Sequence, residues 1–204
     1  MITLPFIIIF SVIAYKFPKT IRKYDRYIYI AVLLLAIIAF VLQQAPIFKP
    51  INQGYIGLSL FYIVMITGAF PKKSKLRIQF SKVRKELSII GFILVAPHGL
   101  KYLFQFLNGE IDIPIYGIIV FVLMIPLFIT SFSFIRKKFT YSNWKKLQSL
   151  SYLTYLGLFI HMINVSDTIE KSNFILYVVL FTVYFILKIT YEIRRRNINE
   201  KSTK

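Results

Sequence analysis

The sequence predicts an all-α protein, a polytopic transmembrane helical bundle of about seven spans, and three observations support this. Hydrophobic residues make up 57% of the 204-residue chain and the mean hydropathy is +0.65, well above the values typical of soluble domains. Crossing a bilayer takes about 20 residues of helix, and apolar runs near that length recur along nearly the whole chain. The basic residues, which give a net charge of +18, are concentrated between those runs.

The apolar runs define the expected spans, taken in order: residues 2–15, 27–44, 55–70, 87–107, 115–135, 147–165 and 174–193. The first is short, but no basic stretch precedes it and no small-residue cleavage site follows it, so we expect a retained helix rather than a signal peptide. Residues 46–54 are expected to form a turn-rich loop. No repeat or linker divides the chain, so we expect a single transmembrane domain over residues 1–204 with a basic tail over 194–204.

Charge placement predicts the orientation in the membrane. The segments after the first, third, fifth and seventh spans hold 22 of the 26 basic residues, whereas the alternate loops hold Lys49, Lys171 and four of the eight acids. By the positive-inside rule the C-terminus is cytoplasmic, the N-terminus lies outside, and the protein is a multi-pass protein of the cell membrane. This pattern accounts for the net charge without a nucleic-acid partner. The absence of cysteine excludes thiolate metal sites and disulfides.

The two histidines of the chain both lie inside apolar spans. His98 comes about 11 residues into the fourth span and His161 about 14 residues into the sixth, which places both roughly 17–21 Å from the inner edge at about 1.5 Å per residue. An ionisable side chain at such depth usually faces protein and serves a function. Equal depth on two parallel helices is what one ligand shared by two imidazoles requires, and a b-type haem iron is the leading candidate.

Other interpretations of these histidines remain open. Either one can hydrogen-bond a neighbouring helix or line a proton path. A zinc centre is disfavoured, because two imidazoles without cysteine or a nearby buried carboxylate leave a tetrahedral site incomplete. Gly91 and Gly157 would leave room for a flat macrocycle, or would simply pack helices closely. Lys101, one turn beyond His98, would pair with a haem propionate or extend to the outer interface.

The residues between positions 52 and 165 resemble the ferric reductase-like transmembrane domain family, and most closely the haem-binding membrane subunit of the bacterial methionine sulfoxide reductase system. The resemblance rests on the span from Gly54 to Pro71, on the pattern that begins Arg84-Lys-x-Leu and leads to His98, and on Trp144-x-x-Leu leading to His161. It implies a ferric reductase-like haem-binding core over residues 52–165, within a six-helix core preceded by the short N-terminal helix. His98 and His161 align with the outer haem ligands, and Arg84 with a basic residue near the inner site.

The sequence departs from the family at Gln148, where the resemblance implies an inner haem-ligating histidine. Glutamine is a poor ligand for haem iron, so we expect one haem b per chain, with FMN or a quinone completing the inner part of the path. No Gly-x-Gly-x-x-Gly pattern follows a strand, so no dinucleotide-binding domain is expected. The chain therefore reads as an electron-transfer subunit of an oxidoreductase system rather than a complete enzyme.

Together these features predict a membrane b-type cytochrome. It would relay electrons from a cytosolic flavin or NAD(P)H reductase, or from membrane quinol, to an extracytoplasmic redox protein or ferric iron. The iron would be ligated by His98 and His161, with Arg84 and Lys101 as further cofactor-binding residues. The alternative is a non-redox membrane protein, such as a transporter subunit or assembly factor, that has the same bundle in the lipid bilayer and carries no haem.

Overall fold

The computed structural model describes the backbone of residues 2–202 and the side chains of residues 2–167 and 169–195. Every regular element in this part of the chain is a helix, which confirms the all-α prediction. Each of the seven predicted spans overlaps one of the longer helices: α1 (Thr3–Lys16), α3 (Asp25–Val41), α5 (Tyr55–Thr67), α7 (Arg84–Leu107), α8 (Ile115–Ile129), α11 (Leu150–Asn164) and α12 (Lys171–Ser202). Helix α12 therefore continues into the predicted basic tail, of which residues 203 and 204 lie outside the described residues.

Short helices occupy several segments between the spans: α2 (Pro18–Lys23), η1 (Pro46–Phe48), α4 (Lys49–Asn52), α6 (Lys75–Ser81), α9 (Ser133–Arg136), α10 (Tyr141–Gln148) and η2 (Ser166–Thr168). The expectation of a turn-rich loop over residues 46–54 was therefore wrong for most of that segment. Side-chain caps explain two of these helices. The hydroxyl of Ser74 accepts a bond from the Arg77 amide at the start of α6, and that of Thr140 accepts one from the Asn143 amide at the start of α10.

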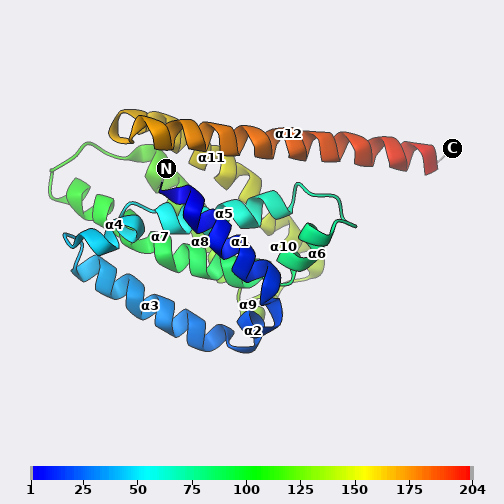
Figure 1. Cartoon of the computed structure of the whole chain (residues 1–204), viewed down its shortest axis with the longest axis horizontal. Helices are drawn as coiled ribbons and strands as arrows, with labels where there is room; N and C mark the ends of the chain where they lie inside the picture. The colour runs from blue at the N-terminus through cyan, green and yellow to red at the C-terminus, as the bar shows by residue number, and fades with distance from the viewer. Residues whose placement is uncertain (1, 203–204) are drawn as a thin grey trace.

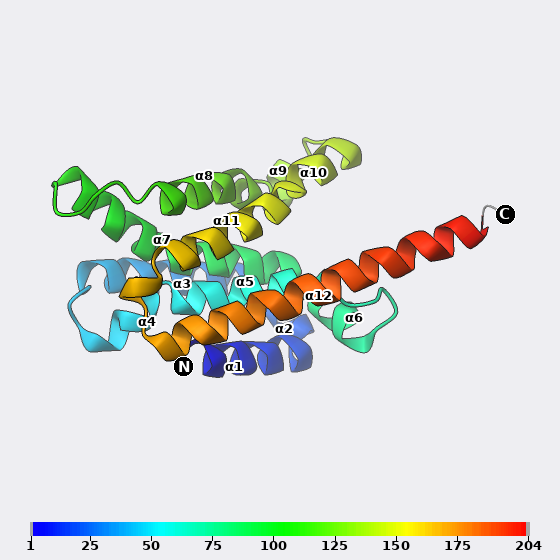
Figure 2. The same cartoon turned by 90° about the horizontal axis from the view of Figure 1, so that it is seen from above.

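Helix α5 lies at the centre of the bundle, and nine of its 13 residues are buried. Helices α1 and α7 make most of its contacts, and α12 passes beside it (Figure 1). Seen from above, α5 and α7 lie between α1 on one side and α8 on the other (Figure 2). The apolar core that results includes Leu60 and Ile63 of α5 and Phe181 of α12, each only 1% exposed. In a bundle that lies in lipid, side chains packed in this way contribute mainly through van der Waals contact.

Polar contacts fasten the first helix to this core. The Thr3 hydroxyl lies 2.8 Å from the Tyr177 hydroxyl of α12, and the Ile2 amide donates to the Asn173 side chain over 3.0 Å. The Ser59 hydroxyl of α5 donates to the Thr3 carbonyl over 3.3 Å. Because Thr3 and Ser59 are both fully buried, these groups satisfy one another away from solvent. The short N-terminal helix is therefore an integral part of the bundle.

The outward-facing surfaces of the helices are apolar. On α3 alone, Leu33, Leu34, Ile37 and Ile38 are each about half exposed. An apolar surface of this extent is unusual for a soluble monomer and is typical of helices that face lipid. Within the described part of the chain, two helices are long and apolar enough to cross a membrane, α7 and residues 171–195 of α12. These features support the membrane class, while the number of seven crossings remains a prediction.

The basic segments gather at one end of the bundle. Helices α2, α6, α9 and α10 lie at the same end, toward which α12 also extends, while α4 and the 108–114 loop lie at the opposite end (Figure 1). The alternation of charge along the sequence thus becomes a separation of charge in space. We refer to these as the basic end and the opposite end.

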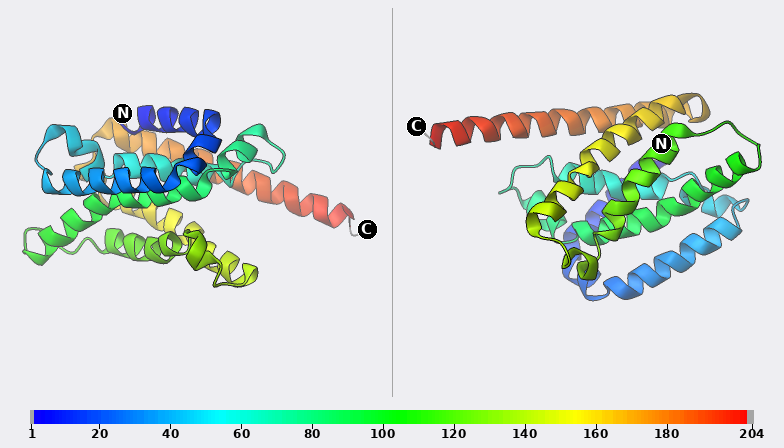
Figure 3. Two further views of the ribbon diagram at one scale, coloured as in Figure 1. Left: turned by 90° about the horizontal axis from the view of Figure 1, so that it is seen from below. Right: turned by 180° about the vertical axis from the view of Figure 1, so that it is seen from behind.

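Helices α8 and α11 form a closely packed pair (Figure 3). A Cβ atom added at Gly157 of α11 would lie 3.0 Å from Val120 of α8, and one added at Gly91 of α7 would lie 3.3 Å from Leu60 of α5. Neighbouring helices therefore fill the space beside both glycines. Of the two interpretations of Gly91 and Gly157, these contacts support close helix packing.

Candidate functional site

The two histidines meet between α7 and α11. The centroids of the His98 and His161 rings are 6.4 Å apart and the ring planes are inclined by 71°. Both side chains are partly buried. Helices α7 and α11 pack mainly against other neighbours, α7 on α3 and α5 and α11 on α8, so the imidazoles approach each other across a junction between these helix groups. The structure thus brings together the two residues that the sequence analysis paired by depth.

A backbone carbonyl sets the orientation of the His98 ring. Nδ1 of His98 lies 3.2 Å from the carbonyl oxygen of Asn52, at the end of α4. Because a carbonyl oxygen only accepts hydrogen bonds, Nδ1 is the protonated nitrogen in this contact, and Nε2 keeps its lone pair. This is the arrangement that proteins use to present an imidazole to a metal. Asn52 is itself held in place, because its side-chain amide donates to the Ala39 carbonyl of α3 over 2.9 Å.

One glycine lies against each histidine. Gly54 has a φ of +75° and caps the start of α5, and a Cβ atom there would lie 3.3 Å from Cγ of His98. A Cβ atom at Gly117 of α8 would lie 3.2 Å from Cε1 of His161. The sequence analysis missed both as site residues. A detectable signal existed for Gly54, since a glycine just before a predicted helix is a common point of positive φ.

The separation of the rings is compatible with one metal ion between them. Metal–imidazole bonds are about 2.0 Å long, and an imidazole with ring bonds of about 1.33 Å has a radius of about 1.1 Å. Two bonds and two radii in line therefore span about 6.2 Å, close to the observed 6.4 Å. Among the side chains that the structure describes, no cluster of three or more His, Cys, Asp or Glu residues is placed to hold a metal. A metal held by the two imidazoles would therefore take its remaining ligands from groups other than these side chains.

Lys101 lies on the far side of His98 from the basic end. Its ammonium is 5.7 Å from the Tyr102 ring centroid, and that ring in turn is 5.0 Å from the His98 ring. Lys101 also lines a cavity of about 340 Å³ near the opposite end, together with Phe40, Gln44 and Glu110. An ammonium placed there is available to an anionic group near the histidines.

Arg84 is remote from the histidine pair. It begins α7, 14 residues before His98, which corresponds to about 21 Å along the helix. Its guanidinium lies next to the Tyr155 hydroxyl of α11 and lines a second cavity at the basic end. The structure therefore does not place Arg84 with the other three predicted site residues.

Gln148 is engaged in helix packing. Its side-chain amide donates to the Thr130 hydroxyl at the end of α8 over 3.0 Å, and the indole of Trp144 donates to the Thr130 carbonyl over 3.2 Å. The Arg136 guanidinium lies 4.3 Å from the Trp144 ring centroid, a cation–π distance. These contacts fasten α10 to α8 and α9. Position 148 thus carries a structural hydrogen bond.

A known protein family matches the region of the chain that holds the first of the two histidines and most of the helices around them. The family described as ferric reductase like transmembrane component matches residues 53–159, slightly over half of the chain and inside the predicted 52–165 range. An uncharacterized protein of Treponema pallidum (strain Nichols) is 24% identical over 198 residues, which cover 87% of this chain and 55% of that protein. The chain thus spans about half the length of this relative. No solved structure matches.

Proposed function

Since the chain belongs to the ferric reductase-like transmembrane family, we propose that it is a membrane b-type cytochrome. In this proposal His98 and His161 each give one nitrogen to the iron of a single haem b. The observation that carries the proposal is the imidazole pair, 6.4 Å apart and reached from two different helices. Haem supplies one-electron chemistry when bound, and the chain supplies position and environment.

The surrounding residues support this role. The Asn52 carbonyl holds Nδ1 of His98 and so leaves Nε2 available as a ligand. Gly54 and Gly117 allow the two rings to approach their helices closely. Lys101 would pair with a propionate, since it lies one helical turn beyond His98 and both side chains lie against the Tyr102 ring. Each of these contacts restricts the imidazoles and so favours one ligation geometry.

The inner part of the path is proposed to use a different carrier. The Gln148 side chain is hydrogen-bonded to Thr130, and glutamine is a poor iron ligand, so we infer one haem per chain. FMN or a quinone would carry electrons through the inner part of the path. The donor would be a cytosolic flavin reductase or membrane quinol, and the acceptor an extracytoplasmic redox protein or ferric iron. We propose that its role resembles that of the haem-binding membrane subunit of the methionine sulfoxide reductase system.

Absorption spectroscopy tests this function. Protein purified from haem-replete cells should show a Soret band that shifts on reduction with dithionite, and a pyridine haemochrome assay should give about one haem per chain. Absence of the band would favour the non-redox alternative, in which the two imidazoles only join α7 to α11. A ratio near two would require a further ligand and would contradict the role given to Gln148.

A further inference from the structure

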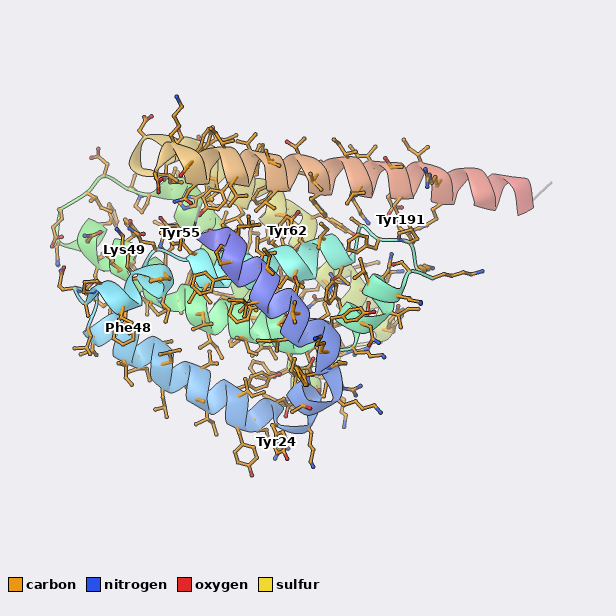
Figure 4. The ribbon with its side chains drawn as sticks, viewed as in Figure 1. Tyr24, Phe48, Lys49, Tyr55, Tyr62 and Tyr191 are labelled. Atoms are coloured by element: carbon orange, nitrogen blue, oxygen red, sulfur yellow. The ribbon has the colours of Figure 1, made fainter. Side chains whose placement is uncertain are left out.

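A second cavity, of about 590 Å³, lies at the basic end and has no role in the proposed haem site. Its walls come from residues at the end of α5, in the segment leading to α6, at the start of α7, on α10 and α11, and on the C-terminal part of α12. Figure 4 shows one of its lining residues, Tyr191, on the part of α12 that passes over the α6 region. Segments far apart in the sequence therefore converge on one space.

Positive charge dominates this cavity. The cations in its lining are Lys72, Arg77, Arg84, Lys145, Lys188 and Arg195. Its one carboxylate, Glu192, is already paired with Lys188 over 2.7 Å and with Arg195 over 3.3 Å. Among the described residues, the other four cations form no ion pair with an acid. Cations gathered in this way repel one another, and a bound anion would relieve that repulsion.

Tyrosine hydroxyls add neutral hydrogen-bond donors to the same cavity: Tyr141, Tyr152, Tyr155, Tyr184 and Tyr191. Two cations lie over tyrosine rings, with Arg77 5.2 Å from the Tyr191 centroid and Lys188 5.1 Å from that of Tyr152. Tyrosine is enriched where a membrane helix meets the aqueous interface. Arginine and lysine with hydroxyl donors are the side chains that recognise phosphate groups.

An apolar ridge leads away from this cavity. Tyr152, Leu156 and Ile160 follow at intervals of four residues on α11, so they share one face of the helix. Leu156 is 45% exposed and Ile160 is 40% exposed. A phosphate held in the cavity would therefore have a continuous apolar surface beside it on which acyl chains could lie.

We propose that this cavity binds the phosphate group of an anionic phospholipid, with its acyl chains along the Leu156 face of α11. Phosphate from a soluble cofactor such as FMN offers the same chemistry to the cations, but only a lipid also uses the ridge. Basic pockets between membrane helices on the cytoplasmic side bind such headgroups in general. This proposal is independent of the haem, because the cavity lies at the start of α7, 14 residues before His98.

The test compares full-length variants in nanodiscs of phosphatidylcholine, with or without phosphatidylglycerol. Lys72→Gln/Lys145→Gln removes two cations of the cavity, whereas Lys137→Gln/Lys138→Gln removes two exposed cations of the same end that do not line it. We expect phosphatidylglycerol to raise the unfolding temperature of the unchanged protein and to be retained in native mass spectrometry. The cavity variant should lose affinity roughly tenfold or more, and the control should keep it.

Four results would overturn the proposal. Equal phosphatidylglycerol binding by the cavity variant and the control would show that only the general charge of this end matters. No preference for phosphatidylglycerol over phosphatidylcholine would exclude an anionic-lipid site. Stabilisation by FMN or inorganic phosphate, without stabilisation by phosphatidylglycerol, would assign the cavity to a soluble phosphate. Finally, a Leu156→Gln variant that binds phosphatidylglycerol as tightly as the unchanged protein would show that no acyl chain lies on the Leu156 face of α11.

Discussion

At the scale of single residues, the proposed site depends on how two imidazoles are held. His98 has a hydrogen-bond partner in the Asn52 carbonyl and a glycine backbone beside its ring. His161 has Gly117 against its ring edge. Steric space is therefore as important here as hydrogen bonding, because a methyl group at either glycine would meet an imidazole carbon at close range.

Gly117→Ala should disturb haem binding without unfolding the bundle. The added Cβ atom would lie 3.2 Å from Cε1 of His161, so the ring must shift, and overpacking of this kind costs about 1–3 kcal/mol. We expect lower haem retention and a changed reduction potential, measured by haem-to-protein ratio and redox titration. Gly68→Ala is the matched control, because its Cβ atom would meet only the Met65 carbonyl at 3.4 Å. Equal behaviour of the two variants would contradict a close fit around His161.

The histidine pair could be predicted from the sequence, but its surroundings could not. Counting residues from the start of each span gave similar depths for His98 and His161, and helix geometry is regular enough for that estimate to hold. Which glycine faces which ring depends on helix rotation, so Gly54 and Gly117 were missed, while Gly91 and Gly157 were considered instead. Which side chain packs against a glycine depends on the tertiary structure, and the hydrophobic pattern of a single span does not predict it.

At the scale of elements, the apolar helices followed from composition while the short helices did not. The segments rich in lysine and arginine between the predicted spans were given no helix, yet α6 and α10 form there. Their start signals were present in the sequence as Ser74 and Thr140, each followed by residues that continue a helix. The charge of these segments predicted on which side of the membrane they lie, but it gave no information about their conformation.

Removing the Gln148 side-chain amide should weaken the attachment of α10 and leave the haem content unchanged. Gln148→Leu deletes the hydrogen bond to Thr130, and such a bond contributes about 0.5–1.5 kcal/mol to stability. Thermal unfolding should therefore shift downward, while the pyridine haemochrome ratio stays near one. Ser142→Ala, at an exposed position of the same helix, should change neither quantity. Loss of haem from Gln148→Leu would instead mean that Gln148 contributes to cofactor binding.

At the scale of the whole molecule, charge and histidine depth are organised along one axis. The basic helices lie at one end (Figure 1). The second cavity is lined there by Arg84 and other cations, and His98 lies about 21 Å further along α7. If the basic end faces the cytoplasm, as the positive-inside rule predicts, the histidines lie nearer the outer surface. This separation underlies the proposed direction of electron flow.

Topology reporters test that orientation. A reporter fused after residue 204 should be active as a cytoplasmic fusion, and one inserted in the acidic loop at residues 108–112 should be active as an external fusion. The physical reason is the retention of 22 of the 26 basic residues on the inner side. The opposite activities would place the histidine pair in the inner half of the bilayer and would reverse the proposed path.

The central claim is that one iron is shared by His98 and His161, and the low-spin haem spectrum of single variants tests it most directly. His98→Ala and His161→Ala should each abolish the six-coordinate low-spin signal in absorption and electron paramagnetic resonance, because loss of either nitrogen leaves the iron five-coordinate or unbound. Asn164→Ala, at an exposed position three residues beyond His161 on α11, should retain it. If both histidine variants kept the unchanged protein's low-spin spectrum, the shared-iron account would be wrong.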